Sequence, residues 1–384
     1  MNNRLKSNGR SGHYVRQPLG FSAFVPKPLP PTEPAISIDD EMQVLLSDAD
    51  RALGRLDGSI QTLPDADLFV LMYIRKEAVL SSQIEGTQSS LTDVLEAEAN
   101  LMDAERPGDV AEVINYIGAL KYGIARLESL PVSTRLIREI HERLMTGVRG
   151  QERSPGEVRV SQNWIGPGGV TLNDAAFVPP PPHEVQPALA GLEKFVHAES
   201  RLPVLLRIGM VHSQFETIHP FLDGNGRVGR LLITLLLCEQ RVLSQPVLYI
   251  SHYLKANRQD YYELLQAVRD QGAWEAWLKF FLRGIRTVSD EATETARRIV
   301  ALREAHRKLI TASFGKAAGN GLTLLEELFR SPVVSVNYVA QFLQMTHSGA
   351  NNLVRRMVDA GVLVEVTGRP RYRAFRYGPY VDLF

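Results

Sequence analysis

The sequence has almost no cysteine, no excess of charge and no long apolar run, and each shortage excludes a kind of protein. Its one cysteine, Cys238, lies in an apolar run and can form no disulfide within the chain, which fits a buried thiol in the reducing cytoplasm. The 43 basic and 43 acidic residues cancel, so the overall charge favours neither nucleic acid nor membranes as partners. The longest apolar run, Leu231 to Cys238, is too short to span a bilayer. No secretory signal is visible, since the first residues are polar and basic.

The chain of 384 residues is long for a single domain, and its texture changes along its length. Residues 1–40 are rich in Asn, Gly, Ser and Pro, which predicts an extended arm anchored by Phe21, Phe24 and Val25. Residues 41–310 carry apolar side chains at spacings of three and four, which predicts a mainly α-helical body. We expect helices in this body at 65–86, from 90 onward, and at 109–127, 133–146, 187–198, 203–218, 227–240, 261–269 and 274–285.

Two helix ends and one break in the helical pattern have their own signals. Gly86 suits a helix C-cap, because glycine adopts the left-handed conformation found there, and Ser90 to Asp93 resembles a capping box. Between 158 and 178, β-branched and aromatic residues surround Gly166 to Gly169, which predicts a β-hairpin. An isolated hairpin is marginally stable. This one therefore either packs onto the helical body or holds something.

The last part of the chain, residues 312–384, resembles a winged helix-turn-helix domain in the order of its elements. Three short helices are expected at 322–329, 335–343 and 347–360, and two strands at 361–366 and 372–377. The expected fold is therefore mainly α, with one hairpin on the body and a small C-terminal winged helix-turn-helix domain.

The run from His219 to Arg227, His-Pro-Phe-Leu-Asp-Gly-Asn-Gly-Arg, gathers groups that suit a polyphosphate. Gly224 and Gly226 allow close approach of the backbone. A helix begins directly after them, so its first N–H groups form a natural anion site. Arg227 and Arg230 lie three apart and share one face of that helix. Two guanidinium groups beside free N–H groups indicate phosphate binding.

Two other side chains of this run add chemistry to the phosphate site. Asp223 suits Mg²⁺ through one carboxylate, with phosphate oxygens completing the shell. His219, with an ordinary pKa of about 6.5, accepts a proton near neutral pH. Taken singly, each residue is commonplace, because a lone histidine is usually structural and an Asp before a Gly is usually a turn. The complete run indicates that a hydroxyl is deprotonated beside a metal-bound nucleotide.

The same run resembles the signature of the Fic family, His-Pro-Phe-x-Asp/Glu-Gly-Asn-Gly-Arg-x-x-Arg, and matches it throughout His219 to Arg230. The resemblance extends over roughly residues 65–282. It implies a Fic helical bundle with a β-hairpin flap. It also implies transfer of AMP from ATP, with Mg²⁺, to a Ser, Thr or Tyr hydroxyl of a target protein, with release of pyrophosphate.

The resemblance further implies a role for each residue of the loop. His219 is the general base for the target hydroxyl, Asp223 binds Mg²⁺, and Arg230 holds the γ-phosphate. The backbone of Gly224 to Gly226 and the Asn225 side chain cradle the α- and β-phosphates, and Arg227 supports the phosphates and the leaving charge. The other nucleotide-binding residues that the resemblance implies are Pro220, Phe221 and Leu222.

A second match lies upstream, in the run Ser81-Ser-Gln-Ile-Glu-Gly86. By itself this run is typical of a solvated helix end. Beside the loop it resembles the inhibitory helix of the Fic family, Ser/Thr-x-x-x-Glu-Gly/Asn, with Ser81, Glu85 and Gly86 at the marked positions. The resemblance implies that Glu85 pairs with Arg230 in the place of the γ-phosphate, so that ATP binds with its α-phosphate misaligned. The chain thus resembles the self-inhibited Fic subclass whose inhibitory helix precedes the loop.

The resemblance reaches the expected hairpin as well. In Fic proteins a flap holds the backbone of the target by strand pairing. The residues that stand where the flap is expected are Asn163, Trp164, Ile165 and Gly166. The alternative is a hairpin packed on the surface without a partner.

For the adenine base, Tyr262 and Leu265 match family positions that line the pocket, and Arg269 lies near them in sequence. Tyr262 could equally be an aromatic residue of the core. Gln214, one turn before His219, is a further expected nucleotide contact.

The C-terminal domain is rich in arginine, which suits phosphate contacts with DNA. The alternative is a module that docks a protein or supports a dimer, and helix-turn-helix folds serve many functions. The arginines concerned are Arg355, Arg356, Arg369, Arg371, Arg373 and Arg376.

Three functions therefore remain open on the sequence alone. The first is a protein adenylyltransferase held in check by Glu85, with ATP and a hydroxyl-bearing protein as partners. The second keeps the site but removes AMP, or uses another phosphate-containing donor. The third is a DNA-binding regulator whose Fic body senses a nucleotide. A homodimer is common in the Fic family, although no interface can be identified from the sequence, and no membrane partner is expected.

Overall fold

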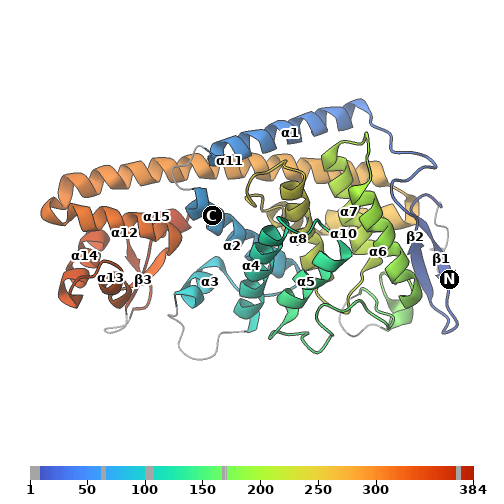
Figure 1. Cartoon of the computed structure of the whole chain (residues 1–384), viewed down its shortest axis with the longest axis horizontal. Coiled ribbons are helices and arrows are strands. Elements are labelled where there is room, and N and C mark those ends of the chain that lie inside the picture. The colour runs from blue at the N-terminus through green and yellow to red at the C-terminus, as the bar shows by residue number, and fades with distance from the viewer. Residues whose placement is uncertain (1–8, 62–65, 100–107, 167–168, 170, 369–372) are drawn as a thin grey trace.

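The apolar spacings of the sequence become helices over most of the chain (Figure 1). The structure, a computed structural model, describes residues 9–61, 66–99, 108–166, 169, 171–368 and 373–384. The expected mainly α fold with a C-terminal helix-turn-helix domain is confirmed. Within the described residues, no helix is both long and apolar enough to span a membrane.

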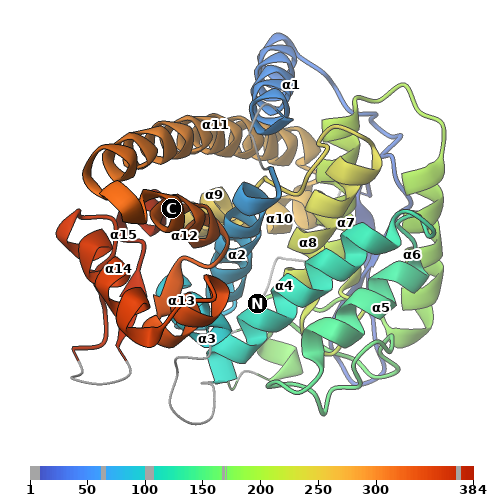
Figure 2. The ribbon, with the colours of Figure 1, turned by 60° about the vertical axis from the view of Figure 1, so that its left-hand side comes forward.

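The helices of the body are α1 to α11, which Figures 1 and 2 label between them. Their bounds are α1 Asp40–Gln61, α2 Ala66–Ile84, α3 Leu91–Glu98, α4 Gly108–Arg126, α5 Thr134–Met145, α6 Pro182–His197, α7 Val204–Ile218, α8 Asn225–Glu239, α9 Ser251–Ala256, α10 Arg258–Gln271 and α11 Trp274–Ser313.

Helix ends follow local signals in the sequence. Helix α3 begins at a capping box in which Ser90 and Asp93 each bond the backbone of the other, as predicted. Helix α2 ends just before Gly86, as predicted, and Gly86 has a positive φ of 101°. The expected start of α2, at residues 64 and 65, lies outside the described residues. Helix α6 begins at Pro182, earlier than expected, because a proline at the start of a helix forfeits no backbone bond.

Two long helices, α1 and α11, run side by side along one edge of the molecule (Figures 1 and 2). Helix α11 continues far beyond the expected 274–285, because its apolar stripe continues past that range. The buried residues of this stripe include Leu278, Leu282, Ile285, Ala292, Ala296 and Ile299. The expected boundary between the body and the C-terminal domain, near 310–312, falls in the last turn of α11.

The N-terminal arm packs through Phe21 and Phe24, which are buried. The arm is not extended throughout its length. Strands β1 Gly12–Arg16 and β2 Ser22–Pro26 pair as an antiparallel hairpin, which was not predicted from sequence. The N–H of Phe24 donates to the carbonyl of Val178, at 2.9 Å. The arm is thereby joined to the segment where the flap was expected.

The hairpin expected at 158–178 is wrong as a pair of regular strands, within the described part of that segment. One isolated antiparallel bridge joins Ile165 to Phe177, and the short 3₁₀ helix Leu172–Asp174 interrupts the return. Residues 167, 168 and 170 lie outside the described residues. Regular strand pairing does not extend beyond this bridge in the described part of the segment, because its backbone and side chains bond the neighbouring loops instead.

The C-terminal domain lies at the end of α11 (Figure 2). Its strands form a sheet in the order β3-β5-β4, and Ser335 and Thr346 cap two of its helices. Strand β3 and the last helix were not predicted from sequence, and Arg369 and Arg371 lie outside the described residues. The element bounds are α12 Ala318–Arg330, β3 Val333–Ser335, α13 Val336–Phe342, α14 His347–Asp359, β4 Val364–Glu365, β5 Ala374–Arg376 and α15 Gly378–Val381, preceded by a 3₁₀ turn at Gly315–Ala317.

One continuous apolar core runs from Met42 in α1 to Val381 in α15. Burial of this kind is the main favourable term in folding. The core places the ends of α2, α7 and α8 near one another, and the functional site is built where they meet.

Candidate functional site

The predicted loop joins the end of α7 to the start of α8. His219 adopts the left-handed conformation, with a φ of 49°, and ends α7. Gly224, with a φ of 74°, precedes the first residue of α8, Asn225. Within the described residues no side chain caps α8, so its first N–H groups remain available to an anion.

The Asn225 side chain closes the loop on itself. Its Oδ1 accepts the N–H of Phe221 and its Nδ2 donates to the carbonyl of the same residue, each at 2.8 Å. Asn225 was expected among the nucleotide contacts. Its amide is instead bonded to the loop backbone, so its direct effect is on the shape of the loop.

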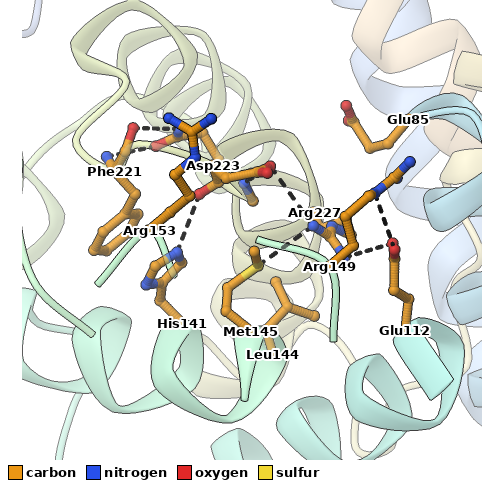
Figure 3. Close-up of polar contacts among 12 residues, drawn as sticks. Glu85, Glu112, His141, Leu144, Met145, Arg149, Arg153, Phe221, Asp223 and Arg227 are labelled. Atoms are coloured by element: carbon orange, nitrogen blue, oxygen red, sulfur yellow. Dashed lines mark hydrogen bonds and ion pairs between the residues drawn. The ribbon is translucent and has the colours of Figure 1, made fainter. Parts of the chain in front are cut away.

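His141 of α5 supports the loop from below, as Figure 3 shows. Its ring stacks on Phe221 with centroids 3.7 Å apart, its Nε2 donates to the carbonyl of Asp223, and its Nδ1 accepts the N–H of Gly156. Burial lowers the pKa of His141 to about 4, so the ring stays neutral. No local motif marks His141, so its contact with the loop could not be predicted from sequence.

His219 is a neutral base in this setting. Burial, with the guanidinium groups of Arg269 and Arg159, lowers the pKa of His219 to about 3. Its Nδ1 has no hydrogen-bond partner within the described residues. An uncharged imidazole is the form that accepts a proton.

Asp223 lies at the edge of the loop and its side chain is 47% exposed. Its Oδ1 accepts the N–H of Gly224, at 2.6 Å, and its Oδ2 faces Gly150, where an added Cβ would lie only 2.8 Å away. No group of three metal-ligating side chains occurs among the described residues. A single open carboxylate beside an anion site fits Mg²⁺, which commonly binds one carboxylate together with phosphate oxygens.

Arg227 points into the protein rather than into solvent (Figure 3). Its Nη1 lies 3.1 Å from Glu112 of α4 and its Nη2 lies 3.8 Å from Asp223. Arg149 also reaches Glu112, at 3.3 Å. Glu112 was not identified from sequence, because it meets the loop only through the packing of α4 on α8.

Arg230 is 1% exposed and faces the end of α2. Its Nη2 lies 2.6 Å from Glu85 Oε1, its Nε donates to the Ser81 hydroxyl at 2.8 Å, and its Nη2 donates to the Ser81 carbonyl. Burial favours the neutral acid, yet Arg230 holds the pKa of Glu85 below its ordinary value. The structure thus brings together Ser81, Glu85 and Arg230, which are far apart in sequence.

Gly226 makes room for this contact. A Cβ at Gly226 would lie 2.2 Å from Glu85 Oε1 and 2.9 Å from Arg230 Nη1. The carboxylate therefore rests on the first turn of α8, where the helix dipole also favours negative charge.

The segment expected as a flap is fastened to the loop by Arg159. The Arg159 side chain donates to the carbonyls of Ser161, Pro180, Ile218 and His219. Asn163 adds a bond from its Nδ2 to the carbonyl of Phe221, at 2.8 Å. Among the other expected flap residues, Trp164 is 44% exposed, Ile165 pairs with Phe177, and Gly166 is exposed.

Of the residues expected around the adenine, Tyr262 and Leu265 lie on α10 and Gln214 lies on α7. Tyr262 is 41% exposed and Leu265 is buried. Burial, and then the Glu85 carboxylate, raise the pKa of Tyr262. Gln214 instead donates to the carbonyl of Lys27 in the N-terminal arm, at 2.8 Å.

The fold and the site together define a helical protein with a loop that leads into an uncapped helix N-terminus. Family profiles agree with this geometry. A profile described as "Fic/DOC family N-terminal" matches residues 43–125, one described as "Fic/DOC family" matches 131–237, and one described as "HTH DNA binding domain" matches 322–376. Residues 43–125 and 131–237 therefore carry the two domains of the Fic/DOC family.

Individual relatives agree with this membership. The chain is 31% identical over 191 residues to a probable protein adenylyltransferase of Aquifex aeolicus, covering 48% of this chain and 54% of the relative. It is 30% identical over 205 residues to the protein adenylyltransferase Fic of Culex quinquefasciatus, covering 51% of this chain and 37% of the relative. The chain thus spans about half the length, or less, of these curated relatives.

A solved structure has a similar fold over most of the chain. It is a Fic family protein from Desulfovibrio desulfuricans, with a TM-score of 0.59 at 20% identity, and the match covers 89% of this chain and 97% of that one. At this identity the likeness concerns the fold alone.

Proposed function

We propose that this protein is a protein adenylyltransferase that transfers AMP from ATP to a Ser, Thr or Tyr hydroxyl of a target protein and is autoinhibited by Glu85. The observation that carries the proposal is the loop at 219–230, where a neutral His219 and an open helix N-terminus lie beside Arg230. The names of the two curated relatives support the same activity.

In this proposal the first turn of α8 binds the phosphates of ATP through its N–H groups. His219 removes the proton from the target hydroxyl, and the oxygen forms a bond to the α-phosphorus while the bond to the β-phosphate oxygen breaks. The products are AMP-modified protein and pyrophosphate. Asp223 would hold Mg²⁺, which neutralises phosphate charge when bound. Trp164 and the backbone of 163–166 would receive the target.

Autoinhibition follows from the position of Glu85. The Glu85 carboxylate lies over Gly226 and contacts Arg230 from there. A γ-phosphate seeking Arg230 would meet a negative charge there, so ATP would bind with its reacting phosphate displaced.

The test is incubation with Mg²⁺ and ATP labelled at the α-phosphate, with γ-labelled ATP as a control for phosphoryl transfer. Label from the α-phosphate should rise at least about tenfold in Glu85→Gly. It should disappear in the double variant Glu85→Gly, His219→Ala. Equal labelling of the single and double variants would sink the role of His219.

The same experiment separates the alternative reactions at this site. Mass spectrometry of the labelled protein should show an added AMP group. Another mass would indicate a different phosphate-containing donor, and loss of AMP from a pre-modified target would indicate the reverse reaction.

DNA contact through the C-terminal domain is a second candidate, favoured by the profile match to a DNA-binding helix-turn-helix. Arg355 is exposed on α14, whereas Arg356 donates to the carbonyl of Ser313 and lies over the Phe314 ring. We therefore expect Arg355→Ala to weaken any DNA binding with little effect on stability. Arg356→Ala should have a smaller effect on DNA binding in relation to its effect on stability. Absence of binding to mixed-sequence duplex DNA at low salt would exclude this candidate.

A further inference from the structure

Glu216 is a buried carboxyl group that neither the loop motif nor the proposed mechanism uses. It lies in α7, one turn before His219, and is 6% exposed. Its Oε1 has no hydrogen-bond partner in the described part of the chain. Burial of a polar group without a partner costs free energy. Such a group in a folded protein therefore calls for an explanation.

The position of Glu216 mirrors that of Glu85 on α8. A Cβ at Gly229 would lie 2.3 Å from Glu216 Oε1, just as a Cβ at Gly226 would lie 2.2 Å from Glu85 Oε1. Positions three apart on a helix lie on one face. Two carboxylates thus press on neighbouring turns of α8, each at a glycine that leaves it room.

Arg230 is the charge that these two carboxylates share. The Glu216 carboxylate acts on Arg230 through space, and Arg230 in turn favours the ionised form of Glu216. Glu85 acts on Glu216 in the opposite sense, because like charges repel. Only Glu85 is within ion-pair distance of Arg230 among the described residues.

We propose that Glu216 sets the strength of the contact between Glu85 and Arg230, as a positioning residue that acts through Arg230 without touching the nucleotide. When Glu216 is ionised, it offsets part of the Arg230 charge and repels Glu85, so the inhibitory contact is loosened. When Glu216 is neutral, Arg230 attracts Glu85 more strongly. The consequence for AMP transfer rests on the proposed function, whereas the consequence for the contact itself does not.

Protonation gives this arrangement a dependence on pH. Burial, opposed by Arg230, raises the pKa of Glu216 to about 7, so the group changes charge near neutral pH. The inhibitory contact is then tighter at pH 6 than at pH 8. The charged and titratable groups that face Glu216 are Arg230 on α8, Glu85 after α2, Tyr261, Tyr262 and Arg269 on α10, and His212 and His219 on and just after its own helix.

The decisive measurement is the preference for ATP over ADP, defined as the dissociation constant of ADP divided by that of ATP, both measured by calorimetry. This ratio reports the interaction of the γ-phosphate with Arg230. Glu216→Gln should enlarge the penalty that Glu85 imposes, which is the ratio of this preference in Glu85→Gly to that in the chain with Glu85, about three- to tenfold, since Glu85 competes more strongly. In the Glu85→Gly background the same substitution should raise the preference, since Arg230 then carries more uncompensated charge. A penalty that is unchanged or smaller in Glu216→Gln overturns the proposal.

Controls separate this effect from damage to the fold. Glu327→Gln changes another nearly buried carboxylate, which bonds Tyr338 in the C-terminal domain, and should leave the preference unchanged in both backgrounds. If Glu216→Gln does not fold, Glu216→Asp keeps the charge but withdraws it from Gly229. It should then enlarge the penalty imposed by Glu85 by a smaller factor, and an unchanged penalty in this variant overturns the proposal.

The measurement is also independent of AMP transfer. A larger Glu85 penalty in Glu216→Gln, in a protein that transfers no label, supports the role of Glu216 and rejects the proposed reaction. Label transfer without a larger penalty supports the reaction and rejects the role of Glu216. The penalty imposed by Glu85 should be smaller at pH 8 than at pH 6, and it should depend less on pH in Glu216→Gln.

Discussion

At the scale of single residues, the site depends on side chains that bond its backbone rather than on those expected to touch a ligand. Asn225 bonds the N–H and the carbonyl of Phe221, and His141 bonds the carbonyl of Asp223 and stacks on the Phe221 ring. Such a hydrogen bond adds little net free energy when both partners can bond water in its absence. A buried backbone group that is left without a partner, however, lowers the stability of the fold considerably. The geometry of His219 and Asp223 is therefore maintained by neighbours that do no chemistry themselves.

Replacing Asn225 by Ala removes both bonds to Phe221. We expect a loss of about 1 to 3 kcal/mol in the free energy of unfolding, together with loss of most AMP transfer in the Glu85→Gly background. Urea denaturation and α-phosphate labelling measure the two effects. Asn352→Ala, at an exposed position of α14, is the control and should change neither. Full activity in Asn225→Ala would contradict the role of its amide in shaping the loop.

The low pKa of His219 predicts an unusual pH profile. A base must be neutral to accept a proton, and a pKa of about 3 keeps His219 neutral far into the acid range. In the Glu85→Gly background we therefore expect kcat/KM not to fall between pH 8 and pH 6. A fall in kcat/KM at acid pH with an apparent pKa near 6.5, the ordinary value for histidine, would show that the pKa of His219 is not lowered.

At the scale of elements, the contact between α2 and α8 decides whether Arg230 is accessible. Helix α2 presents Ser81 one turn before Glu85, so the hydroxyl and the carboxylate reach the same guanidinium. The contact depends on how α2 is held, and its aromatic side chains pack on distant parts of the chain. Tyr73 stacks on Tyr249 and meets Phe384 edge-on.

Ser81→Ala tests this element directly. Loss of the bond from Arg230 Nε should weaken the inhibitory contact, so labelling should rise above that of the unchanged chain but stay below that of Glu85→Gly. The matched control is Ser82→Ala, because the neighbouring hydroxyl is also fully buried but has no hydrogen-bond partner within the described residues. A similar rise in both serine variants would mean that α2 itself had been disturbed.

At the scale of the whole molecule, the C-terminal domain shares its core with the helical body. Phe329 of α12 is fully buried and packs against Phe69 of α2, with ring centroids 5.8 Å apart, and against Tyr377 and Tyr380. The domain thus braces the same helix that ends in Glu85. A continuous core of this kind favours cooperative unfolding.

We expect Phe329→Ala to destabilise the entire chain by about 3 to 5 kcal/mol, the usual cost of removing a buried phenyl ring. Thermal unfolding followed by near- and far-ultraviolet circular dichroism should show one shifted transition. Phe342→Ala is the control, since that ring is 39% exposed on α13 and should have little effect. Two separate transitions, of which only one shifts, would show that the body and the domain unfold independently.

The parts of this protein that could be predicted from sequence are those encoded locally. Helical spacing, the capping box at Ser90 and the glycine after α2 depend on residues within a turn or two of one another. The loop from His219 to Arg230 is likewise a continuous run. The expected hairpin at 158–178 failed because its bonding partners, such as Phe221 and Pro180, lie in other segments.

The sequence by itself thus determined the helical class of the protein, the loop that would carry chemistry and the upstream run that resembles an inhibitor. Only the tertiary structure decided that His141 and Arg159 fasten the loop, that Arg227 meets Glu112, and that Glu216 of α7 lies against Gly229 of α8. The physical reason is that charge and burial act over distance in space. The environment of Arg230 is created by chain segments that the folded core alone brings together.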